Sequence, residues 1–405
     1  MWKDWPRIFL TISLISVISS CQKQADEASI AFKVYCEMVA NDAKPVAFQY
    51  PMAPESVDLR WSDFEQIAKG YDVQLFREDS FPETLLFPSE ATAAKTVVII
   101  YTGNRLKQYQ QWKHDVLVSN EEDFKSQEAL ARRLGRLLGY SAQGVNNLLR
   151  KNTAYRDLAS FGIDGQLTHL YYEDIGKAVT FYSEVLGLPQ NDSTRFQIST
   201  NGYIQLHLFD EKHTKEQPKS TAIALLTDQL PEWYAYVKEK EVPIKYTYRP
   251  KDDGPHDGFV VIDPGGYLLE FEQFKQHPEN ELFMAALAQT KKVVTKIDSL
   301  NFFATVTWTY HQDLLKMQHF YDEVLGYTMV ADQGWTKIYQ TSPSTFIGLV
   351  DERRGMQNYA DDKAVNIEWN IADKPGFDQY ANTHLREYHT VSGLIGPEKY
   401  QYIIR

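Results

Sequence analysis

The arrangement of hydrophobic and polar positions changes near residue 165. Before it, helical spacing of apolar residues over 61–69 and 127–149 alternates with β-branched or aromatic runs at 72–76 and 96–101. Such a mixture of the two periodicities predicts an α+β unit, which we delimit as residues 21–155. No segment of this unit has the spacing of a catalytic motif, and we assign it to no family.

From residue 165 onward, short strands alternate with single helices. The order predicted is strand, helix, strand, strand, strand, and it occurs twice before residue 276. Seven of the eight strands in this order can be delimited, at 166–172, 196–200, 203–209, 221–227, 244–248, 258–262 and 267–274, and the helices are 175–186 and 230–240. We therefore expect one domain at residues 163–276, built from two βαβββ modules.

The chain then repeats itself, because FYSEVLG at 181–187 returns as FYDEVLG at 320–326. Around the second string the pattern predicts strands at 302–308, 344–350 and 364–372 and helices at 312–325 and 376–388. We match 400–405 to 258–262, so the strand corresponding to 267–274 is expected to be missing. The second domain, 299–405, is therefore predicted to be incomplete, and a helical linker at 277–298 joins it to the first.

The N-terminus has the pattern of an export signal. Lys3 and Arg7 precede an apolar run, 8–17, which is too short to span a membrane. The run leads into Ile-Ser-Ser-Cys ending at Cys21, which resembles the bacterial lipobox. The resemblance implies a signal peptide at 1–20, lipidation of Cys21, a membrane anchor and a place in the bacterial cell envelope, at the periplasmic face of the outer membrane. A cleaved signal without lipid is the alternative.

Charge and cysteine content limit the possible partners and disulfide bonds of the chain. The formal net charge of the 405-residue chain is −12, which argues against a nucleic-acid partner, because such partners require clustered Lys and Arg. With two cysteines in the chain, modification of Cys21 leaves Cys36 without a disulfide partner. Apolar neighbours in KVYCEMV favour a buried and inert Cys36 thiol.

Three segments in order resemble the vicinal oxygen chelate superfamily, which includes glyoxalase I, bleomycin-resistance proteins and extradiol dioxygenases. They are HLYYEDIGKAVTFYSEVLGLP at 169–189, TAIALLTDQL at 221–230 and DPGGYLLEFE at 263–272. The resemblance implies an α+β fold in which paired βαβββ modules curl around a cleft. It also implies a divalent ion (Zn, Ni, Mn or Fe) in the first copy, acting as a Lewis acid.

The metal ligands that the resemblance implies are only partly present. Glu270 matches the carboxylate ligand of the closing strand and is the expected catalytic residue. Gln205 falls at the ligand position of the middle strand, with His207 on the same strand face as a substitute. Ala222 stands where metal-binding members have histidine. A surface glutamate on an edge strand is the alternative for Glu270.

The first strand leaves two registers open, which place either Leu167 or His169 at the ligand position. Both residues point to one sheet face. The expected metal set is therefore His169, Gln205 and Glu270, although a hydrogen-bonded core histidine is the alternative for His169. His256, in the predicted turn 254–258, is expected to rim the cleft and contact substrate, unless it is simply solvated.

The second copy is not expected to bind metal. Its corresponding positions are Val306, Phe346 and Asn366, and its cleft is expected to be lined by apolar and aromatic residues, Trp308, Phe346 and Trp369 among them.

Three functions remain open. The favoured one is binding of a small molecule in the cleft without full metal chemistry. The second is a metal-dependent glyoxalase-like lyase or isomerase that uses His169 and Glu270. The third is a non-catalytic scaffold at the membrane, in which the N-terminal unit or a second chain, as in a homodimer, covers the unpaired strand edge.

Overall fold

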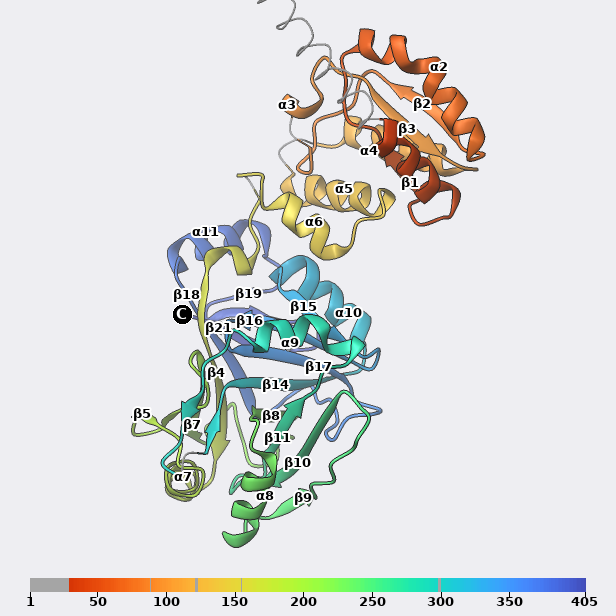
Figure 1. The fold of residues 1–405 in the computed structure, drawn as a ribbon. Coiled ribbons are helices and arrows are strands. Elements are labelled where there is room, and N and C mark those ends of the chain that lie inside the picture. The colour runs from red at the N-terminus through yellow and green to blue at the C-terminus, as the bar shows by residue number, and fades with distance from the viewer. Residues whose placement is uncertain (1–28, 88, 121–122, 154, 298–299) are drawn as a thin grey trace, which may run out of the picture. The chain divides into compact units, whose positions relative to one another are not determined.

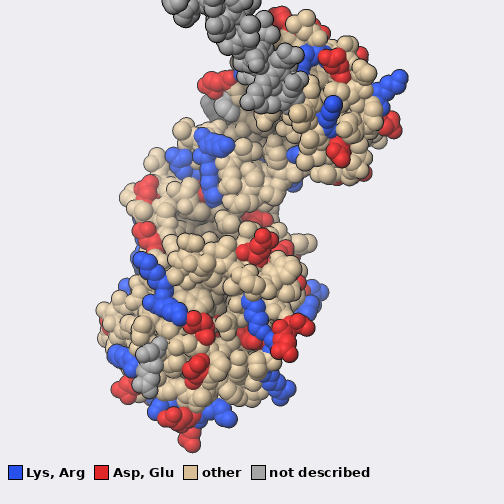
Figure 2. Space-filling model, viewed as in Figure 1, with Lys and Arg blue, Asp and Glu red and all other residues tan. Residues whose placement is uncertain are grey.

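The computed structural model describes residues 29–87, 89–120, 123–153, 155–297 and 300–405, and it divides into two units, Met1–Tyr155 and Arg156–Arg405 (Figure 1). The expected signal peptide and Cys21 lie outside the described residues. Within those ranges, no helix is long and apolar enough to cross a membrane. Acidic and basic side chains are interspersed over the visible surface of both units (Figure 2).

The first unit is α+β, as predicted. Its three-stranded sheet has the order β1 (Val46–Phe48), β3 (Val97–Tyr101), β2 (Gln74–Glu78). The continuous apolar run of β3 is explained by its position, since Val97 and Ile99 pack in one hydrophobic cluster and Val98 and Ile100 in another. The helices are 29–40, α2 (Pro54–Gly70), α3 (Ser89–Thr92), α4 (Arg105–Val118), α5 (Phe124–Leu137) and α6 (Ala142–Leu149).

The thiol of Cys36 is buried and free, in agreement with the sequence. Burial raises its pKa to about 12, so the unreactive thiol form dominates at neutral pH.

The second unit contains four βαβββ modules, which we name A to D in chain order. Module A has β4 (Ile163–Tyr172), α7 (Ile175–Thr180), η2 (Phe181–Val185), β5 (Gln190–Asp192), β6 (Arg195–Gln197) and β7 (Gly202–Leu208). Module B has β8 (Thr221–Leu226), α8 (Leu230–Glu239), β9 (Ile244–Tyr246), β10 (His256–Ile262) and β11 (Leu268–Phe274). Module C has β14 (Ala304–His311), α10 (Leu314–His319), η4 (Phe320–Leu325), β15 (Thr328–Asp332), β16 (Thr336–Ser342) and β17 (Thr345–Asp351). Module D has β18 (Val365–Ile371), α11 (Lys374–His384), β19 (His389–Thr390), β20 (Gly393–Ile395) and β21 (Gln401–Ile404). The repeated strings FYSEVLG and FYDEVLG form π-helical turns, η2 in the first copy and η4 in the second.

The modules pair crosswise between the two copies. One eight-stranded sheet has the order β19-β20-β21-β18-β4-β7-β6-β5 and joins modules D and A; the other, β15-β16-β17-β14-β8-β11-β10-β9, joins C and B. We name them the A/D sheet and the B/C sheet. One face of each sheet packs with the helices in a shared hydrophobic core. Between the sheets, the hydroxyls of Thr168 and Thr307 lie 2.8 Å apart.

The expected loss of a strand from the second copy is wrong, because β21 fills the closing position. It pairs in parallel with β18 as β11 pairs with β8. The residues before the two strands correspond closely. The Tyr267 hydroxyl donates to the carbonyl of Ala364 and accepts from the amide of Tyr171, while the Tyr400 hydroxyl donates to Ser220 and accepts from Tyr310. The true match of 400–405 is therefore 267–272.

The linker between the two copies is less helical than predicted. Residues 277–298 contain a 3-10 turn η3 (Pro278–Asn280), the short helix α9 (Glu281–Leu287) and β12 (Val293–Val294), which pairs with β13 (Asn301–Phe302). Phe283 of α9 is fully buried and packs edge-on against Phe274 and Phe346. This helix therefore covers part of the outer face of the B/C sheet.

Candidate ligand-binding cavity

A cavity of about 380 Å³ lies against the face of the B/C sheet that is turned away from the shared core. Aromatic side chains from both copies form part of its wall, namely Tyr246, Phe274, Trp308, Tyr310 and Trp335, and Met356 lines it as well. Charged side chains line it too, among them the basic Arg249, Lys251 and Arg354. A cavity of this size that combines apolar walls with convergent polar groups is typical of a small-molecule site.

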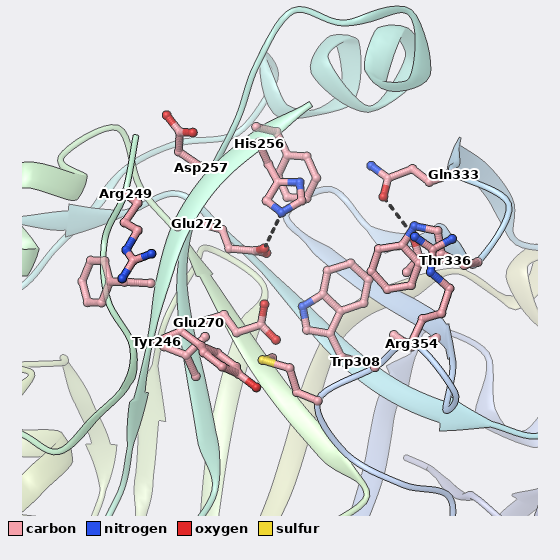
Figure 3. Close-up of a pocket in the computed structure, with 18 of the residues that line it drawn as sticks. Tyr246, Arg249, His256, Asp257, Glu270, Glu272, Trp308, Gln333, Thr336 and Arg354 are labelled. Carbon is pink, nitrogen blue, oxygen red and sulfur yellow. Dashed lines mark hydrogen bonds and ion pairs between the residues drawn. The ribbon is translucent and has the colours of Figure 1, made fainter. Parts of the chain in front are cut away.

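Strand alternation places the acidic residues in this cavity. On β11, Leu269 and Phe271 point into the shared core, so Glu270 and Glu272 point to the opposite face and line the cavity. Figure 3 shows Glu270, Glu272, His256 and Trp308 facing the same space.

The opposite wall depends on a glycine. Gly348 on β17 is the strand neighbour of Trp308 on β14, and a Cβ atom at Gly348 would lie 1.9 Å from Cε3 of the indole. Because real Cβ contacts are never so short, the position of the Trp308 ring requires glycine here. Arg354 lies over the Trp335 ring at 4.9 Å, at the edge of the cavity.

The two carboxyl groups are strongly perturbed. Glu270 is 9% exposed and Glu272 is 5% exposed. Burial raises the pKa of Glu270 to about 7, although the hydrogen bond with Glu272 opposes this shift. Burial and the charge of Glu270 raise the pKa of Glu272 well above its usual range. The pair therefore keeps at least one proton at neutral pH.

Several polar atoms around the pair have no hydrogen-bond partner among the described residues. They are Nε1 of Trp308, Nδ1 of His256 and Oε2 of Glu272. His256 Nε2 lies 4.0 Å from Glu272 Oε1, and burial lowers the pKa of His256, which keeps the ring neutral. Buried polar atoms without partners are rare in native proteins, so this cluster offers contacts to a ligand.

His256 thus lies beside Glu272 and lines the cavity, and its expected contact with substrate stays a prediction. It begins β10 rather than standing in a turn. Trp308 lines the cavity as predicted. Trp369 instead lies fully buried in the shared core, where it stacks on Tyr402. Glu272 was missed, although its spacing of two residues from Glu270 on a predicted strand already places both side chains on one face.

The expected metal set is not assembled around one point. His169 and Gln205 are neighbours on β4 and β7 of the A/D sheet, whereas Glu270 belongs to the B/C sheet. The physical reason is the crosswise pairing, which places modules A and B in different sheets. The Gln205 amide is also engaged, since its oxygen accepts from Arg195 and its nitrogen donates to Thr194.

On the A/D sheet His169 is part of a stacked cluster of rings. Its Nδ1 lies 2.7 Å from Nε2 of His207, and its Nε2 lies 3.4 Å from Glu368. Tyr171 stacks between His207 and His213, with ring centroids 5.2 and 3.8 Å away. Burial and the neighbouring His169 lower the pKa of His207 to about 4. Glu368, Tyr171 and His213 carried no signal in the sequence, because their contacts join segments far apart in the chain.

Within the described ranges, no group of three His, Cys, Asp or Glu side chains is arranged to hold a metal ion.

The match to a family model supports the fold of the second unit. Residues 165–271 match the profile of the Glyoxalase/Bleomycin resistance protein/Dioxygenase superfamily. Glyoxalase I from Zea mays is a similar solved structure, at 13% identity and a TM-score of 0.41, covering 60% of this chain and 91% of the plant protein. A virulence protein from Salmonella typhimurium is 23% identical over 27% of this chain and 94% of its own, with a TM-score of 0.22. No curated protein sequence matches the chain.

Proposed function

We propose that the cleft of the B/C sheet binds a small molecule, in a chain whose residues 165–271 match the model of the Glyoxalase/Bleomycin resistance protein/Dioxygenase superfamily. The guest that fits the lining best is an organic cation with a planar apolar body. The observation that carries this proposal is the buried Glu270 and Glu272 pair between aromatic walls.

The aromatic walls support a planar guest. Trp308, Tyr310 and Trp335 present ring faces and edges, and stacking on such rings favours flat, apolar molecules. Aromatic faces also attract cations that have lost their water.

The acidic pair supports a positive charge on that guest. One carboxylate and one carboxylic acid stay in a buried site only because they share a proton. An ammonium group placed beside them would stabilise both carboxylates and replace that proton. The unpartnered Oε2 of Glu272 is available as an acceptor for such a donor.

A matched pair of probes tests this proposal. 2-Naphthylmethylamine is a cation at neutral pH, and 2-naphthalenemethanol is its neutral analogue. We expect the amine to bind at least about tenfold more tightly than the alcohol, and Glu270→Gln with Glu272→Gln to remove this difference. Glu239→Gln, on the exposed side of α8, is the control. Equal affinities of the two probes for the unaltered protein would contradict the proposal.

One observation favours a second function at the same place. A carboxyl group with a pKa of about 7 in an apolar cavity is suited to proton transfer, and Glu270 has this property. Metal-free proton abstraction by Glu270 is therefore the second candidate. The metal-dependent lyase that needs His169 and Glu270 on one ion is not proposed again, because the two residues lie in different sheets. Attachment to the cell envelope through Cys21 remains a proposal.

A further inference from the structure

The first unit contains a cavity of its own, unrelated to the cleft of the B/C sheet. Its volume is about 330 Å³, and it lies where β1 and β3 meet the segments around Phe81 and Phe87. An engineered cavity of about 150 Å³ is enough to bind benzene. This one has room for a guest of two fused rings.

Gln49 is the unusual residue of this cavity. Its backbone amide extends β1 by donating to the carbonyl of Val98 at 2.9 Å, which fixes the residue against β3. Gln49 is among the residues that line the cavity, and the residue is 1% exposed. Neither Oε1 nor Nε2 has a hydrogen-bond partner among the described residues.

A buried amide with both ends unpaired is costly. Burial without partners forfeits the hydrogen bonds to water at both the oxygen and the nitrogen. Native proteins retain few such groups, and each calls for an explanation. A leucine or methionine would fill this position without that cost, so the amide points to a partner that supplies one donor and one acceptor.

The rest of the lining indicates a neutral aromatic partner. Among the described residues that line the cavity, none is acidic or basic. Six of them are aromatic: Tyr35, Phe48, Tyr50, Phe81, Phe87 and Tyr140. The nearby Lys44 is already engaged, since its Nζ donates to the carbonyl of Leu138 at 2.6 Å and lies over the Tyr140 ring.

We propose that this cavity is a second binding site, and that it takes a neutral planar heterocycle with a cyclic amide edge. The N–H of the lactam donates to Gln49 Oε1, and its C=O accepts from Gln49 Nε2. The ring system packs between the aromatic walls. This site does not depend on the function proposed for the B/C sheet.

Three probes of the same shape test the proposal by ligand-observed NMR on the full chain. 2-Quinolinone presents the lactam edge, N-methyl-2-quinolinone lacks the donor, and naphthalene lacks both groups. We expect 2-quinolinone to bind and each of the other two to bind at least about tenfold more weakly. Equal binding of the three probes, or no binding of 2-quinolinone at millimolar concentration, would overturn the proposal. The Gln49 amide would then be hydrogen-bonded to water alone.

A variant locates the site. Gln49→Met keeps the length of the side chain but removes the amide, so the empty protein should melt at a higher temperature while binding of 2-quinolinone falls at least about tenfold. Gln66→Met, on the exposed side of α2, is the matched control and should change neither value. Unchanged 2-quinolinone binding by Gln49→Met would place the probe elsewhere and refute the assignment. A fall in melting temperature would show that Gln49 has a structural partner instead.

Discussion

Glu270 and Glu272 lie two positions apart on β11, on one face of the strand, and both side chains are buried in one cavity. Two carboxylates so close in a site of low polarity cannot both ionise without a large cost in free energy. The pair therefore stores a proton at neutral pH. This property links the stability of the empty protein, its pH dependence and the charge of the guest that we propose.

The first prediction concerns stability against pH. Both glutamates have a pKa in the folded protein above that of the unfolded chain, so the folded state binds more protons above about pH 4.5. The free energy of unfolding should therefore fall as the pH rises from 5 to 8. Relative to the variant with Glu270→Gln and Glu272→Gln, the loss should be at least about 1 kcal/mol, measured by urea unfolding.

The control for this experiment is Glu239→Gln, which should keep the full pH dependence because this residue is exposed. Parallel curves for the unaltered protein and the double variant would show that the two carboxyl groups are not buried as described.

The second prediction concerns the wall of the cavity. Gly348→Ala should weaken binding of 2-naphthylmethylamine at least about tenfold, because the new methyl group occupies the place of the Trp308 ring and forces it to move. Fluorescence titration measures this change. Gly70→Ala, where no atom lies within 4 Å of the added Cβ, should leave the affinity unchanged. Normal binding by Gly348→Ala would mean that Trp308 does not form part of the site.

The third prediction concerns the closing strand of the second copy. Tyr400→Phe removes the hydroxyl that joins this strand to Ser220 and Tyr310, and we expect a loss of about 1–3 kcal/mol in the free energy of unfolding. Tyr267→Phe should cost a similar amount, since its hydroxyl makes the equivalent contacts. If Tyr267→Phe destabilises the protein and Tyr400→Phe does not, the two closing strands are not equivalent.

The fourth prediction concerns membrane attachment. It rests on the sequence of the export signal that ends at Cys21. Cys21→Ser should move the protein from the membrane fraction to the soluble fraction of lysed cells, because the lipid would have no attachment point. Recovery of the variant in the membrane fraction would contradict lipidation at Cys21.

The helices and strands of the second unit could be predicted from the sequence because each shows the hydrophobic periodicity of a helix or a strand. Alternation in β4 and β11, and the strings that precede Gly187 and Gly326, are visible without any knowledge of the fold. The crosswise pairing of modules is different. It depends on contacts between β4 and β18 that are formed by residues about 200 positions apart, and no local pattern records them.

One available signal was misread. Pro264 and Tyr267 in DPGGY correspond to Pro397 and Tyr400 in GPEKY, but the second string lacks the acidic residue and the glycine pair that made the first recognisable. Correct alignment of these two tyrosines would have supplied the missing strand. It would also have removed the unpaired edge on which the scaffold interpretation rested.

Proton release on binding tests the central claim most directly. Calorimetric titration of 2-naphthylmethylamine at pH 6.5, in two buffers of different ionisation enthalpy, measures the number of protons exchanged. We predict release of between one and two protons from the Glu270 and Glu272 pair as the ammonium group enters, because both carboxyl groups are largely protonated at this pH, and no release from the variant with glutamine at both positions. Binding of the amine without proton release, or with equal release by that variant, would contradict the account.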